Sequence, residues 1–299
     1  MDNLIPRLSL NNLINNDKDH LAKLSNALSD HGFFVITDHN IPHELFHQAY
    51  EFSEKFFNLD LDIKNKYSRR EHAGARGYTP FGKETALGES IPDLKEFWHH
   101  GPVIDSSFDK RILENINVNQ IENFNNVFDR LFTEMNNLGI KLLSSIALTL
   151  DLPENFFHNQ TIKGNSLLRL IHYPPSNDKN MYRAREHADI NLITLLIGAN
   201  EPGLEVKDKS NNWIPVSSSF EDIVCNIGDM MQLITENNLK STLHRVIKYE
   251  SDEIKSRYSI PFFLHPSPDT ILKSINNSND EGVLAHDFLD ERLKAIKLY

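Results

Sequence analysis

The sequence predicts a mainly β protein with flanking helices, in which a helical N-terminal half supports a β sandwich or barrel. After residue 160, short apolar segments alternate with turn signals at a spacing of about 8 to 12 residues, as in sandwiches and barrels. Before residue 150, apolar side chains recur at intervals of three and four, which is the period of helices packed on a core. A chain of 299 residues can bury a core of this kind without disulfides.

The N-terminal half begins with a helix, a strand and a second helix. The helices are predicted over residues 16–32 and 42–57, and the strand over residues 33–37. Gly32 at the end of the first helix and Pro42 in the first turn of the second are residues preferred at those positions.

A long helix is the clearest predicted element. Apolar residues step by three and four from Ile121 to Ile146, over about seven turns, and Pro153 cannot continue the helix. We expect it to be the main support under the β core. The chain then divides into a mixed N-terminal region, this helix, the β core and a helical C-terminal tail, over residues 1–115, 116–155, 156–270 and 271–299.

The β core is expected to consist of short strands separated by polar connectors. The apolar segments that predict them are 166–174, 191–198, 203–206, 213–216, 222–228, 231–235, 242–247 and 257–266. His99 and His100, in the segment "EFWHHG", are expected to lie outside this core.

Composition narrows the class of partner. The chain carries 31 basic and 42 acidic residues, for a net charge of −11, which disfavours nucleic acid and anionic membranes as partners. Cys225 is the only cysteine, so no intrachain disulfide can form. With no signal-peptide pattern and no apolar run of membrane-spanning length, we expect a soluble cytoplasmic protein that acts on a small molecule. The sequence leaves its oligomeric state open.

Three residues in the predicted core form a candidate metal site. His187 and Asp189 are two residues apart at the start of a strand, so their side chains point to the same side. His244 lies in a later strand, 57 residues away. Two histidines and one carboxylate suit non-haem Fe(II) and leave coordination positions open on one side of the ion. The alternative without a metal is a β domain in which His187 and Asp189 form a solvated pair at a strand end.

A second pair, Arg257 and Ser259, follows on another predicted strand. Arginine offers a rigid fork of donors that matches a carboxylate, and the serine hydroxyl adds a further hydrogen bond. One strand away from a metal, this pair could hold the far end of a dicarboxylic acid that chelates the ion. Tyr173, in "IHYPP", is a candidate third donor.

Three further residues are candidates for substrate binding. Arg76 and Tyr78 lie in the glycine-rich segment 74–84, which could fold over the mouth of the β core. An exposed loop arginine would explain Arg76 equally well. Phe263 could stack on a substrate, although an aromatic residue on this strand also fits the core.

The order of these residues resembles the isopenicillin N synthase-like family of 2-oxoglutarate/Fe(II)-dependent dioxygenases. The resemblance rests on H-x-D at 187–189, His244 and R-x-S at 257–259, and on flanking segments such as "GFFVITDHNIP" and "NIGDMMQLIT". It covers roughly residues 1–270. It implies a double-stranded β-helix, or jelly roll, with helices packed on one side.

The resemblance also implies an activity. A dioxygenase of this family uses Fe(II), 2-oxoglutarate and O₂, with ascorbate as a stimulant, and releases succinate and CO₂ while it hydroxylates, desaturates or cyclises its substrate. On this basis His187, Asp189 and His244 are the metal ligands and catalytic centre. Arg257 and Ser259 would bind the C5 carboxylate of 2-oxoglutarate, with Tyr173 assisting.

One departure from the family pattern keeps alternatives open. Plant members carry Asn-Tyr-Tyr where this chain has Ile171-His172-Tyr173, so only the last tyrosine matches. The first alternative is an isopenicillin N synthase-type iron oxidase that does not use 2-oxoglutarate. Others are a β-barrel that binds a ligand without turnover, and a zinc hydrolase, which would leave Arg257 and Ser259 without a role.

Overall fold

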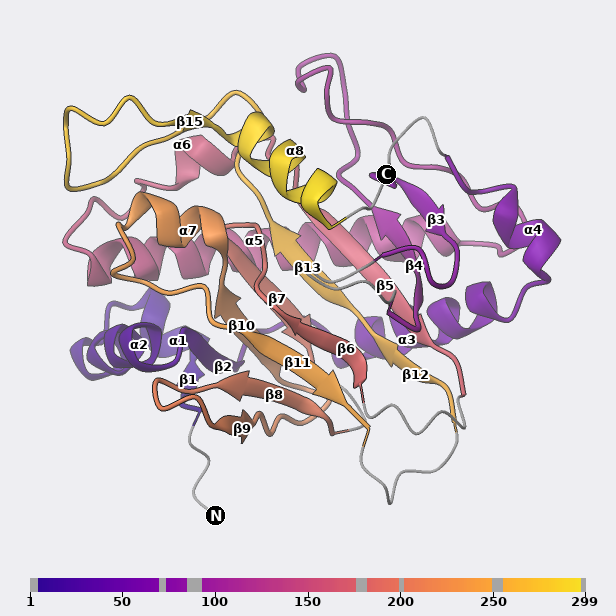
Figure 1. Cartoon of the computed structure of the whole chain (residues 1–299), viewed down its shortest axis with the longest axis horizontal. Coiled ribbons are helices and arrows are strands. Elements are labelled where there is room, and N and C mark those ends of the chain that lie inside the picture. The colour runs from indigo at the N-terminus through magenta and orange to yellow at the C-terminus, as the bar shows by residue number, and fades with distance from the viewer. Residues whose placement is uncertain are drawn as a thin grey trace.

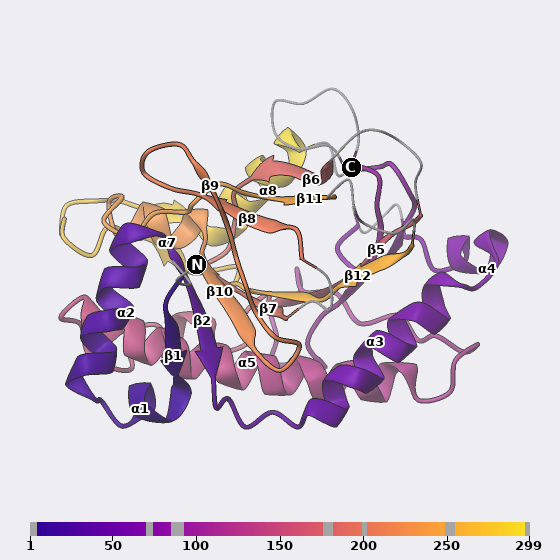
Figure 2. The same cartoon turned by 90° about the horizontal axis from the view of Figure 1, so that it is seen from below.

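Two β-sheets face each other, and helices cover the outer side of the larger one (Figures 1 and 2). The computed structural model describes residues 5–69, 74–84, 93–175, 182–198, 202–248 and 255–296. Figure 2 shows the layers in turn: the smaller sheet, the larger sheet, and then the helices. The arrangement confirms the mainly β fold with a jelly-roll core and flanking helices.

The larger sheet has nine strands in the order β1-β2-β10-β7-β13-β5-β4-β3, with β12 also paired to β5. Only the β1–β2 pair is parallel within this sheet. The strands are β1 (Arg7–Ser9), β2 (Phe33–Thr37), β3 (Gly77–Thr79), β4 (Glu96–His100), β5 (Leu167–Tyr173), β7 (Ile193–Ile197), β10 (Ile223–Ile227), β12 (Arg257–Ser259) and β13 (Pro261–Leu264). Strands from the N-terminal half therefore extend both edges of the sheet formed by the C-terminal half.

The smaller sheet is antiparallel, with four strands in the order β6-β11-β8-β9. They are β6 (Tyr182–His187), β8 (Leu204–Lys207), β9 (Trp213–Pro215) and β11 (His244–Ile247). A separate short pair joins β14 (Ile271–Leu272) to β15 (Val283–Leu284).

The helices lie mainly behind the larger sheet. They are α1 (Leu10–Ile14), α2 (Lys18–Asp30), α3 (His43–Phe57), α4 (Leu61–Asn65), α5 (Phe124–Thr149), α6 (His158–Thr161), α7 (Asp229–Ile234) and α8 (Ala285–Ala295). The long helix α5 runs beneath the sheet (Figure 2), where its apolar face joins the main core cluster. At Gly139 a β-carbon would stand 2.3 Å from Leu264 Cδ1 of β13, so this glycine permits the close approach of helix to sheet. Among the described residues, no helix has the length and apolar character needed to cross a bilayer.

Two local predictions were wrong. The segment 231–235, expected as a strand, is the end of helix α7 and its C-cap Thr235, because the buried side chains of this helix, Met230, Met231 and Ile234, follow helical spacing. His99 and His100 do not lie outside the core, because β4 is a strand of the larger sheet and both of its faces are covered. Their neighbours in the sequence, Phe97 and Trp98, are buried strand residues for the same reason.

Candidate metal centre and cosubstrate pocket

The three predicted metal ligands lie together where the two sheets face each other. Antiparallel pairing of β6 with β11 places His187 directly opposite His244, and their ring centroids are 4.3 Å apart. Asp189 follows β6 by two residues, and its Oδ2 lies 3.9 Å from His244 Nε2. One ligand atom from each of the three residues lies within 4.8 Å of the other two, and no other such group occurs among the described residues.

Backbone carbonyls orient both imidazoles. The Nδ1–H of His187 donates to the carbonyl of Arg185 at 2.7 Å, and that of His244 donates to the carbonyl of Thr242 at 3.2 Å. Each bond occupies Nδ1 and directs Nε2 of the ring towards the other ligands. An imidazole held through one nitrogen is the usual arrangement of a metal ligand, because it sets the direction of the other nitrogen.

Two side chains orient the Asp189 carboxylate. Thr194 Oγ1 donates to Oδ2 at 2.6 Å and Asn226 Nδ2 donates to the same oxygen at 2.8 Å. Burial acts to raise the pKa of Asp189, but the two histidines and these hydrogen bonds outweigh it and hold the pKa below its ordinary value. The group is therefore a carboxylate, the form that binds a metal.

These residues fit the metal that the ligand set suggests. Burial is the main cause that lowers the pKa of His187, to about 4, so its imidazole is neutral and can bind a cation. Two neutral imidazole nitrogens and one carboxylate oxygen are the ligand set of non-haem Fe(II) sites with open positions. The hydrogen bonds around all three are the support that such ligands require.

A cavity of about 410 Å³ opens in front of this cluster. Both sheets, the glycine-rich segment 74–84 and helix α8 contribute to its wall. The predicted site residues that line it are Arg76, Tyr173, His187, Asp189, His244, Ser259 and Phe263. Ligand pockets for small molecules typically have volumes of about 300 to 1,000 Å³.

Arg257 lies next to the cavity and is not part of its lining. Its register partner is Tyr173, and its guanidinium carbon lies 5.5 Å from the centre of that ring. The side chain is 3% exposed, and its Nε and Nη1 have no hydrogen-bond acceptor among the described residues. Buried donors without acceptors are costly, and a carboxylate that reaches past Tyr173 and Ser259 would satisfy them.

The structure does not bring Tyr78 to the cavity. Its ring is 2% exposed in the main core cluster, and its hydroxyl donates to Glu96. Arg76 and Tyr78 are two residues apart and would share a face of a regular strand, but Gly77 between them has a φ of +81°, which breaks the alternation. The prediction that Tyr78 contacts substrate was wrong for this reason.

Sequence reasoning missed a buried ionic network in the cavity wall. Lys95 Nζ lies 2.6 Å from Glu84 and 3.0 Å from Asp93. Arg169 lies 3.1 Å from the same glutamate, and its Nε donates to His99 Nε2 at 2.6 Å. Lys95, just before β4, and His99 within it are four residues apart and so lie on the same face of an extended chain, which was the available signal for inward-facing polar side chains.

The charged residues before the metal cluster also have partners. Arg185 contacts Asp93 at 3.4 Å, so it joins the same network through its side chain while its carbonyl holds His187. Glu186 of β6 pairs at 3.3 Å with Lys207 of β8, two strands away in the smaller sheet.

His265 in the cavity wall gives the protein a predicted pH dependence. Burial is the main cause that lowers its pKa from 6.5 to about 4, so the unfolded chain binds a proton more readily than the folded chain. Stability from this group is complete above pH 6.5 and is lost as the pH falls towards 4. Between pH 7.5 and pH 5 we expect His265→Asn to reduce the loss of unfolding free energy by about 2 kcal/mol. Urea unfolding of metal-free protein measures it, and equal losses for wild type and variant would contradict it.

Family models match most of the chain. Residues 5–121 match the model described as "non-haem dioxygenase in morphine synthesis N-terminal". Residues 164–266 match the model of the 2OG-Fe(II) oxygenase superfamily.

Individual relatives agree with the family models. A 2-oxoglutarate-Fe(II) type oxidoreductase of Emericella nidulans is 31% identical over 265 residues, which is 84% of this chain and 75% of that protein. A proline hydroxylase of Petromyces alliaceus is 31% identical over 86% of this chain and 85% of its own length. The crystal structure of a 2OG-Fe(II) oxygenase family protein from Caulobacter crescentus superposes with a TM-score of 0.86 at 35% identity, covering 98% of this chain and 99% of that one.

Proposed function

Because the chain belongs to the 2OG-Fe(II) oxygenase superfamily, we propose that it oxidises a small molecule at an Fe(II) ion bound by His187, Asp189 and His244. The cosubstrates are 2-oxoglutarate and O₂, and the products include succinate and CO₂. The buried cluster of these three residues on the wall of a cavity is the observation that carries the proposal. Hydroxylation, desaturation and cyclisation are the reactions open to it.

Side chains of the protein position the metal and the reactants relative to one another. When bound, Fe(II) and 2-oxoglutarate would supply the electrons that activate O₂, which is the oxidant. Asp189 contributes the negative charge that offsets the metal, and Thr194 and Asn226 keep its carboxylate from rotating. The apolar part of the cavity wall limits the water around the reacting groups, which strengthens electrostatic contacts there.

Arg257, Ser259 and Tyr173 are proposed to bind the C5 carboxylate of 2-oxoglutarate. The two unsatisfied guanidinium nitrogens of Arg257 support this role, and so does the position of Ser259 and Tyr173 in the cavity wall. A dicarboxylate held there would reach towards the metal cluster with its other end.

The relatives favour use of 2-oxoglutarate over the oxidase that lacks it. Proteins similar to this chain over most of its length are named as 2-oxoglutarate-Fe(II) oxidoreductases and 2-oxoglutarate-dependent dioxygenases. The supported cluster of His187, Asp189 and His244 also has no use in a ligand-binding barrel that holds no metal.

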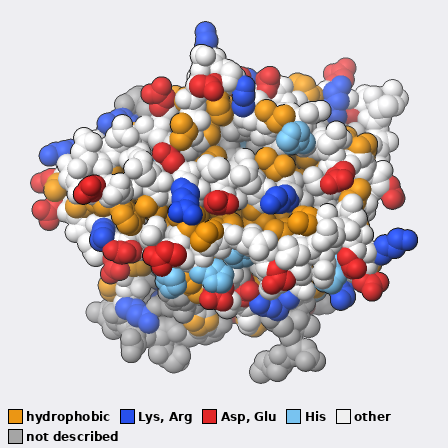
Figure 3. All heavy atoms as spheres, turned by 180° about the vertical axis from the view of Figure 1, so that it is seen from behind, with side chains coloured by type: hydrophobic (Ala, Val, Ile, Leu, Met, Phe, Trp, Pro, Cys, Tyr) orange, Lys and Arg blue, Asp and Glu red, His pale blue; other side chains and the backbone are white. Residues whose placement is uncertain are grey.

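We also propose that the substrate is a small molecule, that the protein has no nucleic acid or membrane partner, and that it is cytoplasmic. The cavity volume suits a small molecule. On the face drawn in Figure 3, acidic and basic side chains are interspersed, which supports the absence of a nucleic acid or membrane partner. The single cysteine fits a cytoplasmic location.

Substrate-stimulated formation of succinate tests the function. Purified protein with Fe(II), 2-oxoglutarate and ascorbate in air is screened against a metabolite collection, and succinate is quantified. We expect at least one compound to raise succinate formation above the uncoupled background, and 2-oxoglutarate to be required. Consumption of O₂ by a substrate without 2-oxoglutarate would instead establish the oxidase.

A further inference from the structure

Arg76 is a buried cation in the cavity wall that has no anionic partner. Its side chain is 2% exposed, and no carboxylate of the described residues lies within ion-pair distance of it. The other buried cations of the wall are paired, since Lys95 and Arg169 both contact Glu84. A charge taken out of water without a counterion is costly, so an arginine kept in this state requires an explanation.

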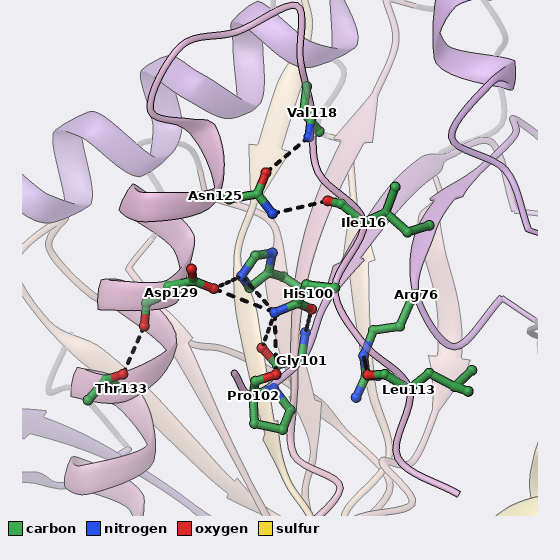
Figure 4. Close-up of polar contacts among 11 residues, drawn as sticks. Arg76, His100, Gly101, Pro102, Leu113, Ile116, Val118, Asn125, Asp129 and Thr133 are labelled. Carbon is green, nitrogen blue, oxygen red and sulfur yellow. Dashed lines mark hydrogen bonds and ion pairs between the residues drawn. The ribbon is translucent and has the colours of Figure 1, made fainter. Parts of the chain in front are cut away.

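The guanidinium is held in place by neutral acceptors. Its Nε donates to the carbonyl of Leu113 at 3.1 Å, its Nη1 to the carbonyl of Ala75 at 2.7 Å, and its Nη2 to Asn165 Oδ1 at 3.4 Å. Figure 4 shows Arg76 beside Leu113 and the segment that starts at Gly101. A β-carbon at Gly101 would stand 2.2 Å from Nη2, so this glycine leaves the space that the guanidinium occupies.

The backbone at Gly101, which packs against the Arg76 guanidinium, is itself anchored. Asn115 accepts from the Gly101 backbone N–H at 2.7 Å and donates to the Gly101 carbonyl at 2.9 Å. His100, next to Gly101, contacts Asp129 of α5 at 2.7 Å (Figure 4). The position of Arg76 is therefore set by the protein before any ligand enters.

Two hydrogen-bond donors of Arg76 remain unused. A guanidinium has five N–H groups, and each of its three nitrogens makes one of the bonds described above. One N–H on Nη1 and one on Nη2 have no acceptor among the described residues. Two donors on adjacent nitrogens match the two oxygens of a carboxylate.

His265 links this end of the cavity to the metal cluster. It lines the cavity, and its Nδ1 is buried without a partner among the described residues. Burial, the Asp189 carboxylate and the Arg76 guanidinium all act on the pKa of His265, so the ring lies within electrostatic range of both groups. The backbone N–H of Asn165 donates to the carbonyl of Pro266, which keeps the Arg76 acceptor beside this histidine.

The remaining wall between these polar groups is largely apolar. Its side chains come from strands of the larger sheet and from helix α8, which lies in front of the sheets in Figure 1. They include Leu167, Phe263, Leu289, Leu293 and Ile296. A bound molecule here meets the unpaired fork of Arg76 at one end, a wall stretch of apolar side chains, and an ionic network around Glu84 whose charges already pair with one another.

We propose that the substrate is a carboxylic acid with an apolar body, and that Arg76 binds its carboxylate while the body lies along the apolar wall towards the metal cluster. Arg76 is then a specificity-determining residue, and Asn165 and Gly101 are positioning residues. This inference rests on the proposed function for the reaction that the bound acid undergoes. Binding of the acid itself requires only the cavity and Arg76.

The test compares acids with their neutral amides. Benzoate, phenylacetate, 3-phenylpropanoate, hexanoate and octanoate are each paired with the primary amide, and affinity is measured by thermal shift under anaerobic conditions. Titrations are done on the Fe(II)-loaded protein with saturating 2-oxoglutarate, so that the Arg257 site is filled, and again without 2-oxoglutarate. We expect at least one acid to bind about tenfold or more tightly than its amide.

Four variants connect that preference to Arg76. Arg76→Gln removes the charge, and we expect the preference for acid to fall to within about threefold of none. Arg76→Lys keeps the charge without the forked pair of donors, and its preference for acid should lie between those of the wild type and Arg76→Gln. Gly101→Ala displaces the guanidinium while its charge remains, and should reduce the preference even if Arg76→Gln fails to fold. Arg130→Gln, at an exposed position on α5, is the matched control.

The results separate the two proposals. Equal binding of acids and amides, binding of neither, or a preference that survives in both Arg76→Gln and Gly101→Ala would overturn the inference. If Arg292→Gln abolishes the preference for acids and Arg76→Gln does not, the carboxylate binds at Arg292, which lies 3.6 Å from Asp229. That result would also overturn the inference about Arg76. If 2-oxoglutarate itself gives no thermal shift, the proposed function fails, whereas the acid–amide comparison without it still tests Arg76.

Discussion

Replacing His187 by alanine is expected to lower Fe(II) affinity by more than about 100-fold and to abolish substrate-stimulated formation of succinate. The variant leaves two protein ligands, and the position opposite His244 in the strand pair becomes a methyl group. Loss of an outer hydrogen-bond partner typically costs about 10- to 100-fold in metal affinity or activity, so loss of a ligand costs more. Iron content after anaerobic loading and succinate yield measure the two effects.

Two further variants bracket this result. Asn226→Ala removes one donor to the Asp189 carboxylate and should lower affinity by about 10-fold, within the range for outer partners. His47→Ala, at an exposed position on α3, should leave iron binding unchanged. Full iron content in His187→Ala would show that the ion binds elsewhere.

Replacing Arg257 by alanine is expected to raise the KM for 2-oxoglutarate by about 100-fold, equivalent to roughly 3 kcal/mol. The guanidinium is buried with two free nitrogens, so a carboxylate bound to it is desolvated and strongly held. At saturating 2-oxoglutarate, kcat should change much less, because the metal cluster is intact. Steady-state kinetics with the substrate found by screening measure both constants.

Two further variants show whether the effect is specific to Arg257. Ser259→Ala removes one neutral hydrogen bond and should raise the KM by about fivefold. Arg130→Ala removes an exposed arginine far from the site in the sequence and should leave it unchanged. A KM for 2-oxoglutarate that stays at the wild-type value in Arg257→Ala would contradict the assignment.

Spacing in the sequence predicted the metal cluster because β-strand geometry is local. Residues two apart share a face of an extended chain, and the side chains of His187 and Asp189 do converge. The prediction that both stand at the start of one strand was wrong, because His187 is the last residue of β6 and Asp189 lies in the connection to β7. The position of His244 depends on strand register, which the sequence does not encode locally. The resemblance supplied the role of His244, and the β6–β11 pairing places it opposite His187.

The failures have equally specific causes. Tyr78 was wrongly predicted to contact the substrate because the left-handed backbone of Gly77 breaks the strand alternation. The presence of a glycine in the sequence does not predict its φ. The network around Glu84 and Lys95 joins the segment 74–84 to the residue just before β4, and residue spacing there indicates a polar row without indicating which charges pair. Helix α7 was misread because a short apolar run fits a strand and a helix equally well. The division of the chain at residues 115, 155 and 270 stays a prediction.

Optical titration under anaerobic conditions tests the central claim most directly. Fe(II) and then 2-oxoglutarate are added to wild-type protein and to His187→Ala, while calorimetry follows binding in parallel. Chelation of Fe(II) by 2-oxoglutarate in the cavity predicts a metal-to-ligand absorption band near the green that appears in the wild type and is absent from the variant. Binding of both components to the wild type without such a band would contradict a chelated complex at His187, Asp189 and His244.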